Sequence, residues 1–403
     1  MTSICVRRLK GAALTMLCVA FFAAKDIQPA YADQFGFDEY PGVSIDIPEG
    51  FSLVNAERDG SGYFLRSTLV PVELAIRFYK QGAYTSAQAA LENSIKKLNG
   101  TCSAKTVTWR NRNAAVAQSF SMNYNGKTVQ GTGASCMLPE KLGTVVVFAW
   151  CTETNCEPYR PFLESCVDSL GIDRGSYYES GIITAAQFSG NAEILPITLT
   201  IGETRIGTAL RENDRAAASA LIEREYAVLS MYKKSPRWKQ AWQRYYRMIF
   251  KDSFHRLNRA AFDIYNALSP SVKDDTELAQ KLLTWTQGFS YEREKNSSDF
   301  TSLPGMLLGE GSDCDARGML LSVLLQNMCV DAILFVSADY GHAIAGLVSD
   351  HPGQKIQVGT KEYLTGETTA QNVTWGMIAQ SQQDFSKWIA IEPPLPFPPE
   401  PKP

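Results

Sequence analysis

The sequence predicts an α+β protein with at least two domains. The chain has 403 residues, and 45% of them are hydrophobic, which is enough for more than one core. Both halves contain runs with the two-residue period of strands and runs with the 3.6-residue period of helices. Between the halves, 171–200 is punctuated by Gly and Ser, as connections between domains often are.

The pattern of the first half predicts a separate, sandwich-like α/β module. Strands are expected at 41–51, 114–124 and 143–151, and helices at 85–98 and 159–170. No nucleophile stands beside a base in this half. We therefore expect this module to bind or position a partner, and not to catalyse.

A basic and aromatic segment opens the second half. The pattern over 214–268 predicts two helices that are broken near Ser235-Pro236. Arg and Lys are interleaved with Trp, Tyr and Phe along this segment. We interpret them as a solvated basic face over an aromatic core stripe. The alternative is a surface for an anionic partner such as a cell-wall polymer.

A buried helix with a cysteine at its start comes next. Residues 315–329 are apolar on nearly every face, and Ser312 with Asp315 three positions later resembles a capping pair. This spacing places Cys314 in the first helical turn. Unpaired backbone N–H groups and the helix dipole both favour a thiolate there, so we expect the pKa of Cys314 to be depressed.

Strands that carry an imidazole and a carboxylate are expected after this helix. Residues 330–338 and 342–348 have strand composition and are joined by a plausible hairpin turn, so His342 begins the second strand. A further strand pair around 357–364 ends at Glu367. A helix that carries a thiol and packs on such strands can form a cysteine-enzyme core.

The order of these three groups is the strongest indication of function in the sequence. Cys314 lies in a Gly-Ser-Asp-Cys segment, His342 in Gly-His-Ala, and Glu367 in Gly-Glu-Thr-Thr. A thiol nucleophile, a base and a group that orients the base make up a nucleophilic catalytic triad. Each residue alone has an ordinary structural interpretation: an inert core cysteine, a buried strand histidine and a solvated strand end. The chain has only three histidines, so their joint occurrence favours the triad.

These segments resemble the transglutaminase-like cysteine superfamily, which has a papain-like core. The resemblance covers 278–388 and implies a nucleophile at Cys314, a general base and acid at His342, and an orienting group at Glu367. By the same resemblance, Gln287 in a Gln-x-x-x-Tyr segment is an oxyanion candidate. The chain departs from the family in having Ser312 before Asp-Cys, Ile344 after His-Ala, and Glu in place of Asp at 367.

The first half resembles PsbP-like α/β modules in its opening strand and in the order of its elements, over about 140 residues. Together with the other segments, this resemblance divides the chain into five parts. They are a signal peptide at 1–32, an N-terminal domain at 33–175, a linker region at 176–200, a helical lead-in with the transglutaminase-like domain at 201–392, and a proline-rich tail at 393–403.

The N-terminus predicts an exported protein, periplasmic or secreted. Arg7, Arg8 and Lys10 precede an apolar stretch at 11–24, and Ala-Tyr-Ala ends at Ala32, where we expect cleavage. The apolar stretch is too short to span a bilayer comfortably, and we expect no stable membrane span after cleavage. Lipidation of Cys18 is an alternative that its flanking residues do not favour.

The chain has nine cysteines, of which two belong to the predicted signal peptide. In an oxidising compartment we expect two disulfides and one leftover thiol among the five in the first half. The alternative is that these thiols are reduced and buried. The five are Cys102, Cys136, Cys151, Cys156 and Cys166. Cys329 has the pattern of an inert core residue, and no Cys-x-x-Cys motif supports a zinc or thioredoxin-type site.

The net charge of -3 is ordinary and indicates neither nucleic acid nor a membrane surface as a partner. The expected partner is a protein, peptide or cell-wall peptide substrate, and no metal or cofactor is implied. We expect a cysteine protease or transglutaminase-like hydrolase that transfers an acyl group from an amide. The rival expectation is a catalytically silent binding or scaffold protein of the cell envelope that keeps the fold.

Overall fold

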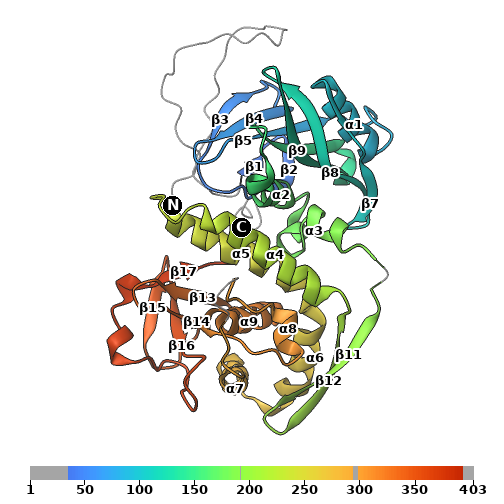
Figure 1. Cartoon of the computed structure of the whole chain (residues 1–403). Helices are drawn as coiled ribbons and strands as arrows, with labels where there is room; N and C mark the ends of the chain where they lie inside the picture. Colours follow the sequence, from blue (N-terminus) through green and yellow to red (C-terminus); the bar gives the residue numbers. More distant parts are fainter. Residues whose placement is uncertain (1–34, 191, 294–297, 394–403) are drawn as a thin grey trace.

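The structure, a computed structural model, describes residues 35–190, 192–293 and 298–393. It confirms the α+β class, since helices and antiparallel sheets occur in both halves of the chain. Figure 1 shows the sheet of the N-terminal half at one end and that of the C-terminal half at the other, with helices α4 and α5 between them. The predicted signal peptide and residues 394–403 of the predicted tail lie outside the described residues.

An eight-stranded antiparallel sheet dominates the N-terminal half. Its order is β3-β4-β5-β10-β9-β8-β6, and β7 also pairs with β8. A short hairpin of β1 (Phe35–Phe37) and β2 (Tyr40–Ile45) precedes it. The strands of the large sheet are β3 (Phe51–Ala56), β4 (Gly62–Ser67), β5 (Val72–Tyr79), β6 (Gly100–Cys102), β7 (Lys105–Trp109), β8 (Arg112–Tyr124), β9 (Lys127–Met137) and β10 (Thr144–Cys151).

The central strand β10 is buried along its whole length because helices cover the two sides of the sheet. Val146 and Phe148 share a core with α1 (Ala87–Lys97), whereas Val145 and Val147 share a core with α2 (Arg160–Asp168). Successive side chains of a strand point to opposite faces, which explains this division. The continuous apolar sequence of β10 therefore reflects burial on both sides.

The segment predicted as a linker is folded. It contains the helix α3 (Ile182–Gln187) and most of the strand β11 (Ile194–Ile201), which pairs with β12 (Thr204–Arg211) in a two-stranded ribbon. Ile182 and Ile183 are buried in the core of the N-terminal half. The Gly and Ser residues of this segment lie at the breaks between short elements. The apolar residues between these breaks form α3 and β11.

Three helices follow, where the sequence predicted two. They are α4 (Asp214–Ser230), α5 (Trp238–Arg256) and α6 (Asn258–Leu268). The predicted break near Ser235-Pro236 separates α4 from α5. Helices α4 and α5 contribute to both major cores: Val228 and Ala241 belong to the core of the N-terminal half, and Leu221 and Tyr245 to that of the C-terminal half.

The C-terminal half is built on a five-stranded antiparallel sheet of order β15-β16-β14-β13-β17. The helix α9 packs against β13 and β14, and its apolar side chains form the largest core together with α6 and α7. The elements are α7 (Asp275–Gln287), α8 (Leu303–Leu307), α9 (Cys314–Asn327), β13 (Ala332–Ser337), β14 (His342–Val348), β15 (Lys355–Val358), β16 (Lys361–Gly366) and β17 (Ile389–Ile391). Helix α9 and the β13–β14 hairpin agree closely with the predicted ranges.

The basic residues of α5 correct the predicted solvated face. Arg244 is only 2% exposed, and Lys251 is also buried. The Arg244 guanidinium donates to Glu225 Oε2 at 2.8 Å and, through two nitrogens, to the backbone oxygen of Asp46 at 2.7 and 2.9 Å. Arg244 therefore lies buried between α4 and the N-terminal half. The carboxylate of Glu225 and the carbonyl of Asp46 compensate its buried charge.

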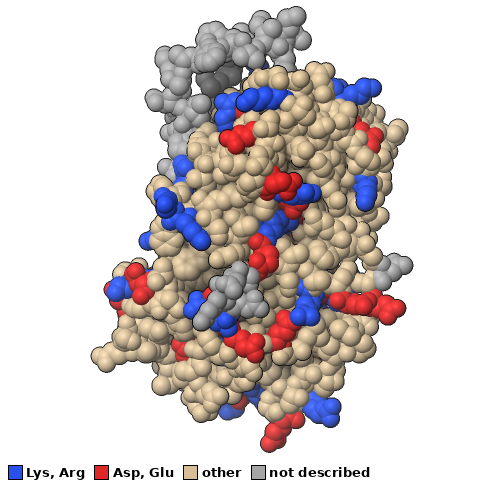
Figure 2. Space-filling view, viewed as in Figure 1, with Lys and Arg blue, Asp and Glu red and all other residues tan. Residues whose placement is uncertain are grey.

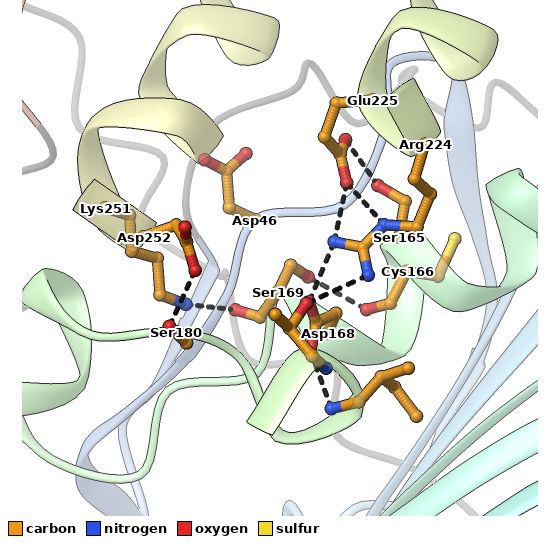
Figure 3. Close-up of polar contacts among 12 residues, drawn as sticks. Asp46, Ser165, Cys166, Asp168, Ser169, Ser180, Arg224, Glu225, Lys251 and Asp252 are labelled. Carbon is orange, nitrogen blue, oxygen red and sulfur yellow. Dashed lines mark hydrogen bonds and ion pairs between the residues drawn. The ribbon is translucent and has the colours of Figure 1, made fainter. Parts of the chain in front are cut away.

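A buried network of charges joins α2 to α4 and α5 (Figure 3). Arg224 of α4 donates to Asp168 Oδ2 at 2.7 Å and to Glu225 Oε1 at 3.0 Å. Glu225 also accepts from Ser165 of α2 at 2.8 Å. Burial opposes the ionisation of Asp168, but Arg224 and the hydrogen bonds from Thr184 outweigh it and lower the pKa. Arg224, Glu225 and Asp168 thus each have a charged or hydrogen-bonding partner, which their desolvation requires.

Acidic and basic side chains are interspersed on the face seen in Figure 2, without an extended patch of one sign. This distribution agrees with the small net charge of the sequence. Within the described ranges, no helix is both long and apolar enough to cross a membrane.

The seven described cysteines are all free thiols, so neither of the two disulfides expected in the first half is formed in this structure. Cys329 follows the end of α9 and is exposed, which corrects its predicted burial in the core. Cys151 and Cys156 flank a short loop and both contact Glu153: its N–H donates to Cys151 Sγ at 3.4 Å, and Cys156 Sγ donates to its carbonyl at 3.1 Å. Burial, together with the neighbouring Cys156 thiol, raises the pKa of Cys151 to about 12.

Removing Arg244 tests the role of the buried network. We expect Arg244→Met to lower the free energy of unfolding by about 3–5 kcal/mol, because Glu225 keeps its buried charge and loses a partner. The matched control is Arg259→Met, whose side chain is 69% exposed and pairs with Asp263, with an expected change of about 0–1 kcal/mol. Urea unfolding of both variants measures the difference. Equal stability of the two variants would contradict the assigned role.

The contact between Cys151 and Cys156 makes them the expected pair if a disulfide forms in the first half. Oxidised glutathione should accept two electrons from these two thiols and convert them to one disulfide. Peptide mapping without reductant should then find Cys151 linked to Cys156, while Cys136 and Cys166 remain open to alkylation after unfolding. Linkage of Cys136 to Cys166 would contradict this assignment.

Candidate active site

Cys314 is the first residue of α9, as the sequence predicted. The capping residue is Asp313, whose carboxylate accepts from the N–H of Ala316 at 3.3 Å. The predicted capping pair of Ser312 with Asp315 is therefore wrong. Ser312 Oγ instead accepts from Arg317 Nε at 3.2 Å, and the helix is capped by the side chain of the next residue, Asp313.

The imidazole of His342 contacts the carboxylate of Glu367. His342 begins β14 and Glu367 follows the end of β16, and these two strands are neighbours in the sheet. The distance from His342 Nε2 to Glu367 Oε2 is 2.7 Å. An ionised carboxylate accepts only, so Nε2 is the protonated ring nitrogen in this contact. The neutral imidazole therefore presents Nδ1 as its acceptor.

Glu367 is held in its ionised form. Burial opposes ionisation, but hydrogen bonds from His342 and from the backbone and hydroxyl of Thr369 outweigh it, and the pKa falls to about 2. The Thr369 N–H and Oγ1 lie 2.7 and 2.6 Å from Glu367 Oε1. The Thr-Thr sequence after the acid thus occupies the oxygen that the imidazole leaves free.

Cys314 and His342 line one cavity of about 400 Å³. The start of β14 contributes Gly341, His342 and Ala343 to its wall, and the start of α9 contributes Cys314. The backbone N–H of Ala343 also hydrogen-bonds to the sulfur. The fold thus brings the predicted nucleophile and the predicted base to the same cavity, and the carboxylate of Glu367 contacts the imidazole of that base.

The Cys314 thiol is protonated at rest, contrary to the expected depression of its pKa. The side chain is buried, with 7% exposed. Burial is the largest cause of a pKa raised to about 12, followed by the carboxylates of Asp315 and Asp313. Desolvation and two adjacent acids outweigh the helix dipole and the Ala343 N–H, which both favour the thiolate.

The two acids beside Cys314 form a coupled pair that is tied to α5. Burial and the Asp315 carboxyl raise the pKa of Asp313 to about 10, so the Asp313 carboxyl carries a proton at neutral pH. Asp315 Oδ2 accepts from the Tyr246 hydroxyl at 2.7 Å. The start of α9 is therefore fixed to the helix that forms the opposite wall of the cavity.

Gln287 ends α7 and is buried beside the acid loop. Its amide nitrogen donates to the carbonyl oxygens of Glu367 and Val373 at 2.9 and 2.8 Å. Both amide protons are thereby used, and this arrangement favours holding the acid loop over the predicted oxyanion role. Its Oε1 has no hydrogen-bond partner among the described residues.

Arg317 is a buried residue of this site that the sequence analysis did not identify. It is 1% exposed and lies one turn after Cys314 on α9. Its guanidinium donates to the carbonyls of Phe289 and Thr368 at 2.8 and 3.3 Å and also to Ser312. It therefore joins the cysteine loop to the acid loop. The sequence did contain a signal for this residue, because an arginine in an otherwise apolar helix is unusual and is buried only with partners.

The sequence analysis also missed the wall that faces the thiol. Tyr226 and Leu229 of α4, with Trp238, Trp242 and Tyr246 of α5, line the cavity. The interleaved aromatics of this segment were interpreted only as a core stripe. Among the described residues, no group of three or more His, Cys, Asp or Glu side chains could hold a metal ion.

No family model and no curated protein matches this chain. A crystal structure from Bacteroides thetaiotaomicron is similar to it, with 13% sequence identity, over 60% of this chain and 80% of that chain, and the TM-score is 0.23. At that TM-score the likeness carries no argument about fold or function.

Replacing Asp315 tests why the thiol is protonated. We expect Asp315→Asn to lower the pKa of Cys314, because one of the charges that oppose the thiolate is removed. Each unit of pKa change alters the thiolate fraction about ten-fold well below the pKa. Iodoacetamide labelling of Cys314 at pH 8, followed by mass spectrometry, should therefore be faster in this variant. The control Asp275→Asn removes an exposed charge from α7 and should leave labelling unchanged. An unchanged rate in Asp315→Asn would contradict the explanation.

Proposed function

We propose that this protein is an exported cysteine enzyme that transfers an acyl group from an amide through Cys314, His342 and Glu367. The observation that carries the proposal is the 2.7 Å contact between His342 Nε2 and Glu367 Oε2 in the wall of a cavity that also contains Cys314. This contact fixes the imidazole in the form that accepts a proton at Nδ1. A thiol that is protonated at rest needs such a base.

The reaction proceeds in two stages. Nδ1 of His342 takes the thiol proton as Cys314 Sγ attacks the amide carbonyl. The imidazolium, stabilised by Glu367, then gives this proton to the leaving amine, and a thioester remains. Water or a second amine attacks the thioester with His342 again as base. Peptide or isopeptide hydrolysis and deamidation use water, and cross-linking uses the amine.

The start of α9 provides a donor for the oxyanion of this reaction. The N–H of Cys314 lies in the first helical turn, where backbone N–H groups have no intrahelical acceptor. Such a donor, fixed before the substrate arrives, stabilises the charge that develops on the carbonyl oxygen. Gln287 fixes the loop that carries Glu367, which keeps the imidazole in place.

A catalytically silent binding or scaffold protein is the second candidate, and one observation favours it. Cys314 is only 7% exposed, and its pKa is raised to about 12. A thiol in this state reacts slowly unless a substrate and a base act on it together. The two candidates therefore differ in whether His342 activates Cys314.

Substitution of the triad separates these candidates. The full chain is incubated with a library of peptide amides, with and without a primary amine, and the products are identified by mass spectrometry. We expect Cys314→Ala and His342→Ala to reduce the rate by about 10²–10⁴-fold. Glu367→Gln should also reduce it while leaving the peptides bound.

The control is Cys329→Ser, which removes the exposed thiol just beyond the other end of α9. Its rate should equal that of the unsubstituted chain. Products formed equally by the chain and by Cys314→Ala would refute the triad. Peptide binding without any product would leave the scaffold function.

A further inference from the structure

The cavity beside Cys314 has one wall that comes from outside the sheet-and-helix module of the triad. Trp238, Trp242 and Tyr246 follow one another at intervals of four residues on α5. Residues spaced in this way lie along one face of a helix. All three line the cavity that also contains Cys314 and His342.

These rings form a continuous row. The centroids of Trp238 and Trp242 are 5.9 Å apart, and those of Trp242 and Tyr246 are 6.0 Å apart. The inner end of the row is fixed at the nucleophile, because the Tyr246 hydroxyl donates to Asp315, the residue after Cys314. The outer end is Trp238, near the start of α5.

The side chains of Trp238 and Trp242 are only partly buried by the rest of the protein. Both keep an intermediate exposure, whereas Tyr246 is buried. The basic residues Arg244 and Lys251 occupy the other side of the same helix, roughly 170° away from the row at 100° per residue. Trp238 packs in part against the core of the N-terminal half and Trp242 against that of the C-terminal half, and both rings also line the cavity.

We propose that this aromatic row is a substrate subsite that selects a large apolar side chain, aromatic or branched aliphatic, close to the amide that reacts. This inference rests on the proposed function, since it uses Cys314 as the reacting group. The row spans eight residues of helix, or about 12 Å. That length matches about three to four residues of extended peptide, so the selected side chain lies within that distance of the amide.

The chemistry of the wall supports an apolar side chain as its occupant. Leu229 and Val336 also line the cavity. A ring placed against two tryptophans gains area burial and offset or edge contacts. A volume of about 400 Å³ is in the range of pockets that enclose most of a bound small ligand.

The test measures binding and turnover separately. Binding is measured by calorimetry in the Cys314→Ser background, with N-acetyl-phenylalanine amide and N-acetyl-alanine amide as probes. Turnover is measured with a tetrapeptide amide library in which one position at a time carries Phe, Leu, Ala or Ser. We expect Phe and Leu to be preferred over Ala at one position, and Trp242→Ala to reduce that preference by about ten-fold, mainly through KM.

Two further variants keep the test interpretable. Trp242→Phe should retain most of the preference, because it keeps a ring in the row. Trp285→Ala removes a half-buried tryptophan of α7 that packs on nearby Phe289 and does not line the cavity, so it should leave the preference unchanged.

Each outcome has a separate meaning. Turnover without preference for an apolar side chain, or equal losses in Trp242→Ala and Trp285→Ala, would overturn the subsite and leave the triad standing. A second outcome is that the phenylalanine probe binds more tightly than the alanine probe, that Trp242→Ala abolishes this difference, and that no peptide is turned over. This outcome would support the subsite and overturn the proposed catalysis. Equal binding of the two probes would also overturn the subsite.

Discussion

The buried ion pairs of α4 and α5 are the constraint on which the rest of the structure depends. Glu225 lies between Arg224 and Arg244, and Arg224 continues the chain of charges to Asp168 in the N-terminal half. Charges with so little exposure are stable only when their partners stay in place. The network therefore holds the N-terminal half against α4 and α5 with a defined geometry, which apolar packing alone specifies less sharply.

This constraint reaches the candidate active site through α5. One side of the helix carries Arg244 and is held by the network, and the other carries the aromatic row that forms a wall of the cavity. Gln243 of the same helix donates to the carbonyl of Ala390 in β17 at 3.0 Å, so α5 is also tied to the C-terminal sheet. The N-terminal half thus helps to position α5 at the candidate site and contributes no side chain to the proposed triad.

The sequence predicted the elements whose pattern is local and could not predict those that depend on distant partners. Helix α9 and the strands of His342 and Glu367 follow from periodicity and turn residues, and their order in the chain indicated a triad. The burial of Arg244 could not be foreseen, because its partner Asp46 is almost two hundred residues away. The same holds for Trp242, which lines a cavity together with Cys314 and His342, both far away in the sequence. The protonated thiol was missed because the helix dipole was weighed without the desolvation of Cys314.

The electrostatics of the site divide the roles of its groups. Glu367 is kept ionised, whereas the Cys314 thiol and the Asp313 carboxyl are kept protonated. Where the environments of neighbouring groups move their pKa values apart in this way, the groups can be assigned to acid and base roles. A substrate that displaces water from the cavity would strengthen the attraction between Glu367 and a protonated His342. In the proposed reaction, the thiol proton then has an acceptor at the moment the carbonyl is in place.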